Sequence, residues 1–453
     1  MSVIFQKFML EEIGQIVTGK TPSSNVMGAF STSGTPFVTP KDMDGRRWIE
    51  TTERYLSQAG IKAVKSYLVP KDSVAVSCIG SDMGKVILLK NDSVTNQQIN
   101  TIIVDTSKNN PQYIYYVLSL KQEELKSIAG GSATPILNKG HFSKIVIELP
   151  SQAYQDNIVK VLDSLDCKIE QNNQINQTLE SIAQAIFKSW FIDFEPVRAK
   201  IAAKQEGSDP ELAAMCAISG KSEAELDQLT KEDFAELQAT AALFPDELVE
   251  SELGEVPRGW ELQQLKDIAK YSSNKILLND LNLENYISTE NMLPEKKGIE
   301  KASSLPKANS VPAFRQGNIL VSNIRPYFKK IWFSFFDGGH SNDVLNFDVL
   351  EKGTEEYLYN LIYQDSFFDR MMASSKGSKM PRGDKKAIMD FQIVTSSVAL
   401  RKLYSEKVRK FYSKQNSIKI ENQILINLRD ALLPKLLSGE LDVSGLQGEG
   451  IDG

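Results

Sequence analysis

The sequence predicts an α+β protein built from two tandem repeats, each a mixed α/β domain followed by a long helix. Three observations predict it. The two halves of the 453-residue chain share identical residues in the same order. Each half begins with short strand-like runs, and each ends in an amphipathic segment without proline or glycine. Self-similarity over nearly half the chain indicates a duplicated domain rather than a solenoid.

The internal repeat is collinear. Offsets of 245, 246 and 249 residues align successive parts of the two halves. The first-half members of the identical pairs are Val76, Ser77, Ile79, Lys85 and Asp92, then Gly131, Ser132, Pro135, Lys139 and Ile147, then Ile169, Asn173, Gln174, Ile175, Leu179 and Asp193. Chance identities would not keep this order, so we expect both halves to fold alike.

Each mixed domain is expected to contain several short strands. Aliphatic and β-branched runs bounded by glycine predict them. The expected strands are 74–76, 85–89, 101–104 and 144–147 in the first half, and 318–321, 330–333 and 390–393 in the second. Pro111 opens a helix expected through Leu120, because proline is favoured at the first helical position.

Two long helices are expected at 155–187 and 400–433. Apolar residues recur along both at the spacing of paired helices. The stripes are Ile158, Leu162, Leu165, Ile169, Leu179, Ala183 and Ile186, and Tyr404, Phe411, Ile418, Leu425, Leu428 and Leu432. Asn172 and Asn176 interrupt the first stripe with a polar layer. Such a layer can determine which helix is the partner and in which register the two helices pair. We expect the two helices to pair; the alternative is that each packs only on its own domain.

The net charge of −6 arises in one segment. Residues 191–256 hold 5 Lys and Arg against 16 Asp and Glu, whereas residues 1–150 hold 16 against 13 and residues 257–453 hold 28 against 24. Both mixed domains are therefore mildly basic, and DNA binding needs a basic surface rather than a basic total. Within the acidic segment, residues 199–256 are expected to form a helical, solvated arm without strands.

Composition excludes several classes of protein. No apolar run reaches the roughly 18 residues of a membrane span, and the first ten residues lack the pattern of a signal peptide. Cys78, Cys167 and Cys216 are too widely spaced for a zinc site or a disulfide framework, which favours the reducing cytoplasm. His141 and His340 are the only histidines, so little histidine-based chemistry is expected.

A polar, glycine-containing loop precedes the last strand of each mixed domain, at 130–139 and 374–386. Glycine lets the backbone approach a duplex, and Lys and Arg bind phosphates or guanine edges. The turn 322–325 and its counterpart 77–80 form a second candidate surface. The candidate DNA-binding residues are Ser132, Thr134, Asn138, Lys139, Asn323, Arg325, Lys376, Lys379, Arg382, Lys385 and Lys386. The alternative is an ordinary solvated loop.

Residues 14–21 match the phosphate-binding pattern G-x-x-x-x-G-K-[ST]. Such a loop requires a preceding strand and a following helix, but Pro22, Ser23 and Ser24 follow here without helical periodicity. The second half carries no such match. A nucleotide hydrolase is therefore the less favoured alternative, and no catalytic residue, cofactor site or metal site is predicted.

Several motifs resemble those of type I restriction–modification specificity subunits, over essentially the whole chain. The most specific are the connectors at 190–197 (WFIDFEPV), 244–246 (FPD) and 251–260 (SELGEVPRGW). The opening residues 10–13 with 19–23, the G-S-x-x-P loop and the C-terminal LLPKLLSGEL complete the set.

The resemblance implies two target-recognition domains held apart by two antiparallel helices, with pseudo-two-fold symmetry. The corresponding segments are a first target-recognition domain at 1–150, a central spacer helix at 151–198, the acidic arm at 199–256, a second target-recognition domain at 257–396, a C-terminal spacer helix at 397–443 and a flexible tail at 444–453.

The resemblance also implies a non-catalytic subunit that recognises a bipartite double-stranded DNA target. Two modification subunits would dock on it and methylate adenine with S-adenosylmethionine, and motor–nuclease subunits using ATP and Mg are a further expected component. None of these cofactors is expected in this chain. The main alternative is a coiled-coil assembly protein without DNA recognition.

Overall fold

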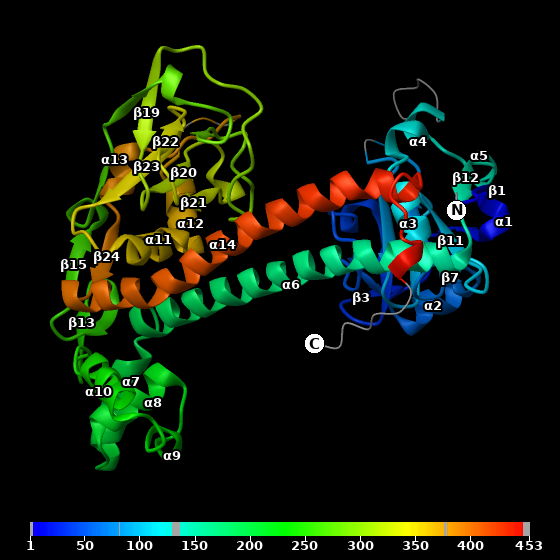
Figure 1. The fold of residues 1–453 in the computed structure, drawn as a ribbon. Coiled ribbons are helices and arrows are strands. Elements are labelled where there is room, and N and C mark those ends of the chain that lie inside the picture. The colour runs from blue at the N-terminus through cyan, green and yellow to red at the C-terminus, as the bar shows by residue number, and fades with distance from the viewer. Residues whose placement is uncertain (1–2, 81, 129–135, 376, 378, 447–453) are drawn as a thin grey trace. The chain divides into compact units, whose positions relative to one another are not determined.

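The computed structural model describes residues 3–80, 82–128, 136–375, 377 and 379–446 (Figure 1). The chain divides into two compact units, Met1–Gln171 with Glu421–Gly453, and Asn172–Ile420. Each unit contains one mixed domain and a part of both long helices. The division inferred from the sequence differs in form: it treats each long helix as a segment separate from the two mixed domains.

The described residues of the first unit form two five-stranded sheets and one strand pair. One sheet has the order β2 (Gly14–Thr18), β11 (Ile99–Val104), β8 (Val74–Ser77), β9 (Val86–Leu89) and β5 (Trp48–Ile49). The other has the order β3 (Phe30–Ser31), β6 (Tyr55–Leu56), β4 (Thr35–Val38), β10 (Ser93–Thr95) and β7 (Leu68–Val69). β1 (Gln6–Met9) pairs with β12 (Val146–Leu149). Both sides of β8 and β11 are almost fully buried, which explains their continuous aliphatic runs.

The second unit repeats four strands of the first sheet and the closing strand pair. Its first sheet has the order β16 (Ala269–Tyr271), β23 (Val344–Val349), β20 (Ile319–Ser322) and β21 (Ile331–Phe333). Its second has the order β17 (Lys275–Leu277), β19 (Ser310–Phe314), β22 (Gly338–His340) and β18 (Tyr286–Ile287), and β15 (Glu261–Gln264) pairs with β24 (Gln392–Thr395). β16, β23, β20 and β21 correspond in order to β2, β11, β8 and β9, which confirms the predicted repeat.

Helices cover the sheets in both units. The first unit has α1 (Leu10–Ile13), α2 (Gln58–Ala63), α3 (Pro111–Ser119), α4 (Gln122–Ile128) and α5 (Lys139–Ser143), and the second has α11 (Glu355–Tyr363), α12 (Asp365–Ala373) and α13 (Lys385–Met389). α3 confirms the helix expected from Pro111, with Asn110 as its N-cap. The closing strands β12 and β24 begin two residues later than predicted, because Lys144 and Asp390 are the C-caps of the short helices α5 and α13.

The long helices α6 (Gln152–Phe191) and α14 (Val398–Leu437) pair, as predicted (Figure 1). In the first unit, Arg429 Nη1 donates to Asp166 Oδ1 at 2.8 Å. In the second unit, the Tyr404 hydroxyl donates to the carbonyl oxygen of Ala183 at 3.1 Å. Residue numbers fall along α14 as they rise along α6, so the helices are antiparallel. Among the described residues, no helix combines the length and apolarity needed to cross a bilayer.

The stripe predicted on α14 is partly wrong. Leu428 is 46% exposed, whereas the polar side chains of Gln415 and Asn422 are buried. Polar layers thus occur on both helices, since Asn172 is also buried. The helix continues through Pro434 to Leu437, beyond the expected end at residue 433.

The acidic arm is helical, but it also contains a hairpin that the sequence prediction lacked. Its helices are α7 (Glu195–Glu206), α8 (Pro210–Ser219), α9 (Glu223–Leu226) and α10 (Lys231–Ala241). α8, α9 and α10 enclose a small apolar core of Ala214, Met215, Leu226 and Ala241. β13 (Leu248–Ser251) and β14 (Gly254–Pro257) follow as an antiparallel pair. In the expected tail, residues 444–446 form a short 3-10 helix, and residues 447–453 lie outside the described residues.

Candidate nucleic-acid interface

Two segments of the second unit that the sequence indicated separately lie against each other. Ile324 and Arg382 form an isolated antiparallel β-bridge. The backbone N–H of Arg325 donates to the carbonyl oxygen of Pro381 at 2.8 Å. The turn after β20 and the basic loop before α13 therefore form one surface, which we call the second loop junction.

The first unit has an equivalent junction. Ile79 and Ile136 form an isolated antiparallel bridge. The offsets of 245 and 246 residues carry this pair onto the bridged pair of the second unit. The backbone N–H of Leu137 also donates to the carbonyl oxygen of Cys78 at 2.9 Å. We call this surface the first loop junction.

The short helices α5 and α13 fix the ends of the two loops. Asn138 Oδ1 accepts a hydrogen bond from the His141 backbone N–H at 2.9 Å, and Asp384 Oδ1 accepts one from the Lys386 backbone N–H at 3.0 Å. These side chains are N-caps, which satisfy free amides at the helix start. The amide nitrogen of Asn138 also lies 3.3 Å from His141 Nδ1. The structure thus gives Asn138 a capping role that the sequence prediction did not include.

The second junction carries most of the predicted cationic residues. The exposed ones are Lys379, Arg382, Lys385 and Lys386. The Arg382 guanidinium lies 3.2 Å from Asp343 Oδ1, and this pairing orients it. The first junction is less basic, with Lys139 exposed at the position equivalent to Lys385. Ser132, Thr134 and Lys376 lie outside the residues that the structure describes.

Asn323 and Arg325 lie deeper in the second junction. Asn323 is 6% exposed, and its Oδ1 lies 3.0 Å from the place where a Cβ on Gly383 would stand. Asn323 Oδ1 and Arg325 Nε are both buried without a hydrogen-bond partner among the described residues. The structure therefore places Asn323 inside the junction and leaves its carbonyl oxygen unsatisfied.

Sequence reasoning missed two aromatic residues beside Arg325. Tyr327 is 47% exposed and Phe328 is 36% exposed, and their ring centroids lie 4.7 Å apart. Burial lowers the pKa of the neighbouring Lys330, whose Nζ donates to the carbonyl oxygen of Thr289 at 2.6 Å. Aromatic residues between cations are a known signature of nucleic-acid surfaces, so the stretch Arg-Pro-Tyr-Phe-Lys-Lys could have indicated this turn.

The apparent phosphate loop is part of a sheet. Its first five residues form β2, which pairs with β11. The Gly19 N–H donates to the carbonyl oxygen of Ile99 at 3.1 Å, and the Lys20 N–H donates to that of Thr95 at 2.8 Å. These amides cannot also surround a phosphate, and Lys20 Nζ lies over the Tyr67 ring. The segment therefore does not support nucleotide hydrolysis.

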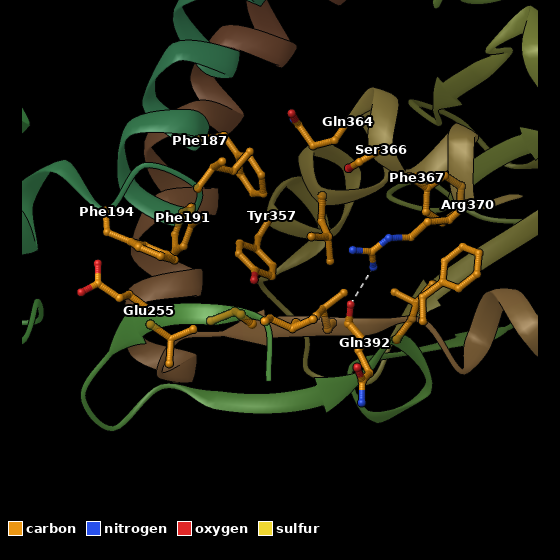
Figure 2. Close-up of a pocket in the computed structure, with 18 of the residues that line it drawn as sticks. Phe187, Phe191, Phe194, Glu255, Tyr357, Gln364, Ser366, Phe367, Arg370 and Gln392 are labelled. Atoms are coloured by element: carbon orange, nitrogen blue, oxygen red, sulfur yellow. Dashed lines mark hydrogen bonds between the residues drawn. The ribbon is translucent and has the colours of Figure 1, made fainter. Parts of the chain in front are cut away.

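A cavity of about 470 Å³ lies in the second unit between the end of α6, α11, α12 and β24 (Figure 2). Phe187, Phe191 and Tyr357 give it an aromatic lining. Arg370 Nη1 donates to the carbonyl oxygen of Gln392 at 2.8 Å. Catalysis requires a nucleophile beside a base or a paired acid and base. Among the described residues that line the cavity, no nucleophile is hydrogen-bonded to a base.

Comparisons with known proteins identify relatives over most of the chain. Residues 3–181 match the model of the type I restriction modification DNA specificity domain. The chain is 31% identical to the specificity subunit of the type I restriction enzyme HindI of Haemophilus influenzae, over 82% of this chain and 87% of that protein. It is 25% identical to the specificity subunit of the MjaIX enzyme of Methanocaldococcus jannaschii, over 96% of this chain and 93% of that protein.

A solved structure shows the same fold. The type I restriction–modification S subunit from M. genitalium superposes with a TM-score of 0.53 at 14% identity, over 96% of both chains. Sequence similarity along nearly the full length of the HindI subunit, together with this fold, defines the relationship. The chain therefore belongs to the family of type I restriction–modification specificity subunits, which determine the DNA target of methylation and restriction and are themselves non-catalytic.

Proposed function

We propose that each mixed domain binds one half of a bipartite DNA target through its loop junction. The observation that carries the proposal is the pair of equivalent bridges, Ile79 with Ile136 and Ile324 with Arg382. Duplicated reading domains on one scaffold fit a target with two half-sites, because the separation of the domains sets the half-site spacing.

The second junction has the chemistry for DNA contacts. Lys379, Lys385 and Lys386 are exposed and can neutralise phosphates, which supplies affinity without sequence information. Arg382 is exposed and oriented by Asp343. A fixed, planar guanidinium suits bidentate recognition of a guanine edge. In the first junction, Lys139 is the corresponding phosphate contact.

We further propose that two modification subunits dock on this chain and methylate adenine, joined by motor–nuclease subunits for restriction. In this proposal the specificity subunit carries no cofactor, and S-adenosylmethionine, ATP and Mg bind the partner subunits. Apolar side chains on the outer faces of the long helices support docking of partner helices, since they remain uncovered here. They are Ile175, Ile182, Ile420, Ile424 and Leu428. The assembled enzyme would act in the cytoplasm, where its DNA lies.

Exchange of residues 1–150 for another target-recognition domain tests the proposal. The hybrid chain is reconstituted with the modification subunits, and methylated adenines are mapped. Only one half of the target should change, because the other junction is intact. A change in both halves together would refute the modular assignment.

The main rival is an assembly protein that does not recognise DNA. Titration of the reconstituted complex with duplexes that do and do not contain the mapped target distinguishes the two. Recognition predicts tighter binding to the target, with affinity falling steeply as salt rises. Equal, weak binding to both duplexes would favour the rival.

A further inference from the structure

Two positions in the second loop junction combine a left-handed backbone with a long cationic side chain. Arg325 and Lys329 both have φ of 49°. The offset of 245 residues relates them to Gly80 and Gly84 of the first unit, with φ of 87° and 81°. Glycine adopts this conformation freely, whereas a Cβ makes it sterically unfavourable. The second repeat therefore retains strained residues at two positions where the first repeat has glycine.

The side chain of Lys329 has a structural role. Its Nζ lies 3.1 Å from Asp365 Oδ2, while Lys296 Nζ lies 2.6 Å from Oδ1 of the same carboxylate. These contacts lower the pKa of Asp365, which is the first residue of α12. The ion pairs fasten the turn to α12, which accounts for a cation at position 329.

The side chain of Arg325 has no comparable role. It makes no hydrogen bond or ion pair with the described residues, and its Nε is buried without a partner. Asn323 Oδ1, two residues before Arg325 and beside Gly383, is also buried without a partner among the described residues. Buried polar groups are normally satisfied, and strained residues cluster where a ligand is bound. These unsatisfied groups therefore indicate a site where a polar ligand supplies the missing hydrogen bonds.

We propose that Arg325 is a specificity-determining residue of the second domain and recognises a guanine in its half-site. The proposal rests on the proposed function and refines it. Backbone contacts already join Arg325 to the loop of Arg382. Arginine can donate two hydrogen bonds to O6 and N7 of guanine, the commonest specific contact in the major groove. The first domain has Gly80 here, so its half-site is recognised by other residues.

The test uses the complex reconstituted from the full chain and its modification subunits. Methylated adenines first give the wild-type target, and binding to the target duplex gives the affinity. Arg325→Gly copies the first repeat and relieves the strain, so folding should not suffer. We expect binding to weaken by about 10- to 100-fold, with methylation tolerating substitution of one G·C pair in one half-site. The other half-site should stay the same.

Arg325→Lys separates recognition of a base from contact with a phosphate. Lysine keeps the charge but not the planar fork, so a base contact predicts relaxed recognition at the same G·C pair. An unchanged target with near-normal affinity would mean a phosphate contact and would overturn the proposal. No effect of either variant would also overturn it. Lys329→Gly is the matched control: it relieves the same backbone strain and removes a cation from the same turn, and it should leave the target unaltered.

Exchange of residues 257–396 separates this inference from the proposed function. If the exchange leaves both half-sites unchanged, the second domain does not read DNA, and the proposed function fails. If it changes one half-site while the Arg325 variants change nothing, only the role of Arg325 is wrong.

Discussion

The carboxylate of Asp166 on α6 accepts a hydrogen bond from Arg429 on α14, with 2.8 Å between Oδ1 and Nη1. Its other oxygen accepts one from the Tyr116 hydroxyl at 2.6 Å and lies 3.6 Å from Arg47 Nη1. The Asp166 side chain is only 7% exposed. One buried anion thus joins the mixed domain of the first unit to both of its helices.

Asp166→Ala should destabilise the first unit by roughly 3 kcal/mol, because Arg47 and Arg429 lose a buried counter-charge. Urea unfolding of the full chain measures the loss. Asp430→Ala is the control, since Asp430 contacts the same Arg429 at 2.7 Å but is 57% exposed. The decrease in the free energy of unfolding of Asp430→Ala should stay below about 1 kcal/mol. Equal losses in the two variants would contradict the role given to burial.

Tyr404→Phe should destabilise the second unit by about 1 kcal/mol, because the carbonyl oxygen of Ala183 loses a buried donor. Tyr357→Phe removes a hydroxyl that is buried without a partner among the described residues. It should be neutral or slightly stabilising. Thermal unfolding of both variants gives the two melting temperatures. A larger decrease for Tyr357→Phe than for Tyr404→Phe would contradict the contact between the Tyr404 hydroxyl and α6.

Glu180 should make the second unit more stable as the pH falls. Burial raises the pKa of Glu180, against opposing hydrogen bonds from Gln184 and Gln415 and attraction to Lys419 and Lys296. A folded-state pKa above the unfolded one means that the folded state binds the proton more tightly. This contribution is present below the unfolded pKa and is lost as pH rises through the raised pKa.

Glu180→Gln tests this direction. The variant should melt above the wild type at neutral pH, and the difference should shrink towards about pH 4, where Glu180 is protonated. Melting temperatures across this range suffice. A variant that is less stable than the wild type at neutral pH would show that the ionised carboxylate is favourable.

Lys20→Ala should leave methylation by the assembled complex at the wild-type level. The backbone amides of this segment are used in sheet pairing, and the Lys20 ammonium lies over Tyr67 rather than beside a phosphate site. ATP turnover by the isolated chain is the decisive assay. Turnover that is present in the wild type and absent in the variant would restore the phosphate-loop hypothesis.

Insertion of one heptad into both long helices, after Gln171 and after Ile420, should lengthen the gap between the half-sites. Seven helical residues add about 10 Å, which corresponds to about three base pairs of B-DNA. Both half-site sequences should remain the same. The connector after α6 is unsuitable for such an insertion, because Phe194 and Val197 are buried in the core. Methylation mapping that shows an unchanged gap would reject the spacer role.

The sequence predicted the structure best where apolar residues recur at a regular spacing and are also buried. Ile158, Leu162 and Ala183 recur at helical spacing and are all buried, so the first helix stripe was predictable. Leu428 fits the same spacing but is exposed, because Asn422 and Arg429 take the inward positions on α14. Apolar spacing alone does not reveal such polar layers.

The loop junctions show what the sequence could not provide. Both segments of each junction were candidates, but no local pattern indicates that Ile324 bridges Arg382, since 57 residues separate them along the chain. The hairpin at 248–257 was missed because its two strands are short and lie at the end of an Ala-, Glu- and Asp-rich segment, whose composition we interpreted as a solvated helical arm. Its left-handed Gly254, with φ of 94°, was the available signal.

The left-handed position shared by Gly80 and Arg325 bears on the symmetry of the recognised DNA. Two identical copies of one domain, related by a dyad, would be confined to palindromes. Covalent fusion of the copies frees each from that restriction, since a substitution in one need not appear in the other. The glycine–arginine difference is such a divergence. A tandem gene product can in this way acquire asymmetric targets one half at a time while its scaffold stays unaltered.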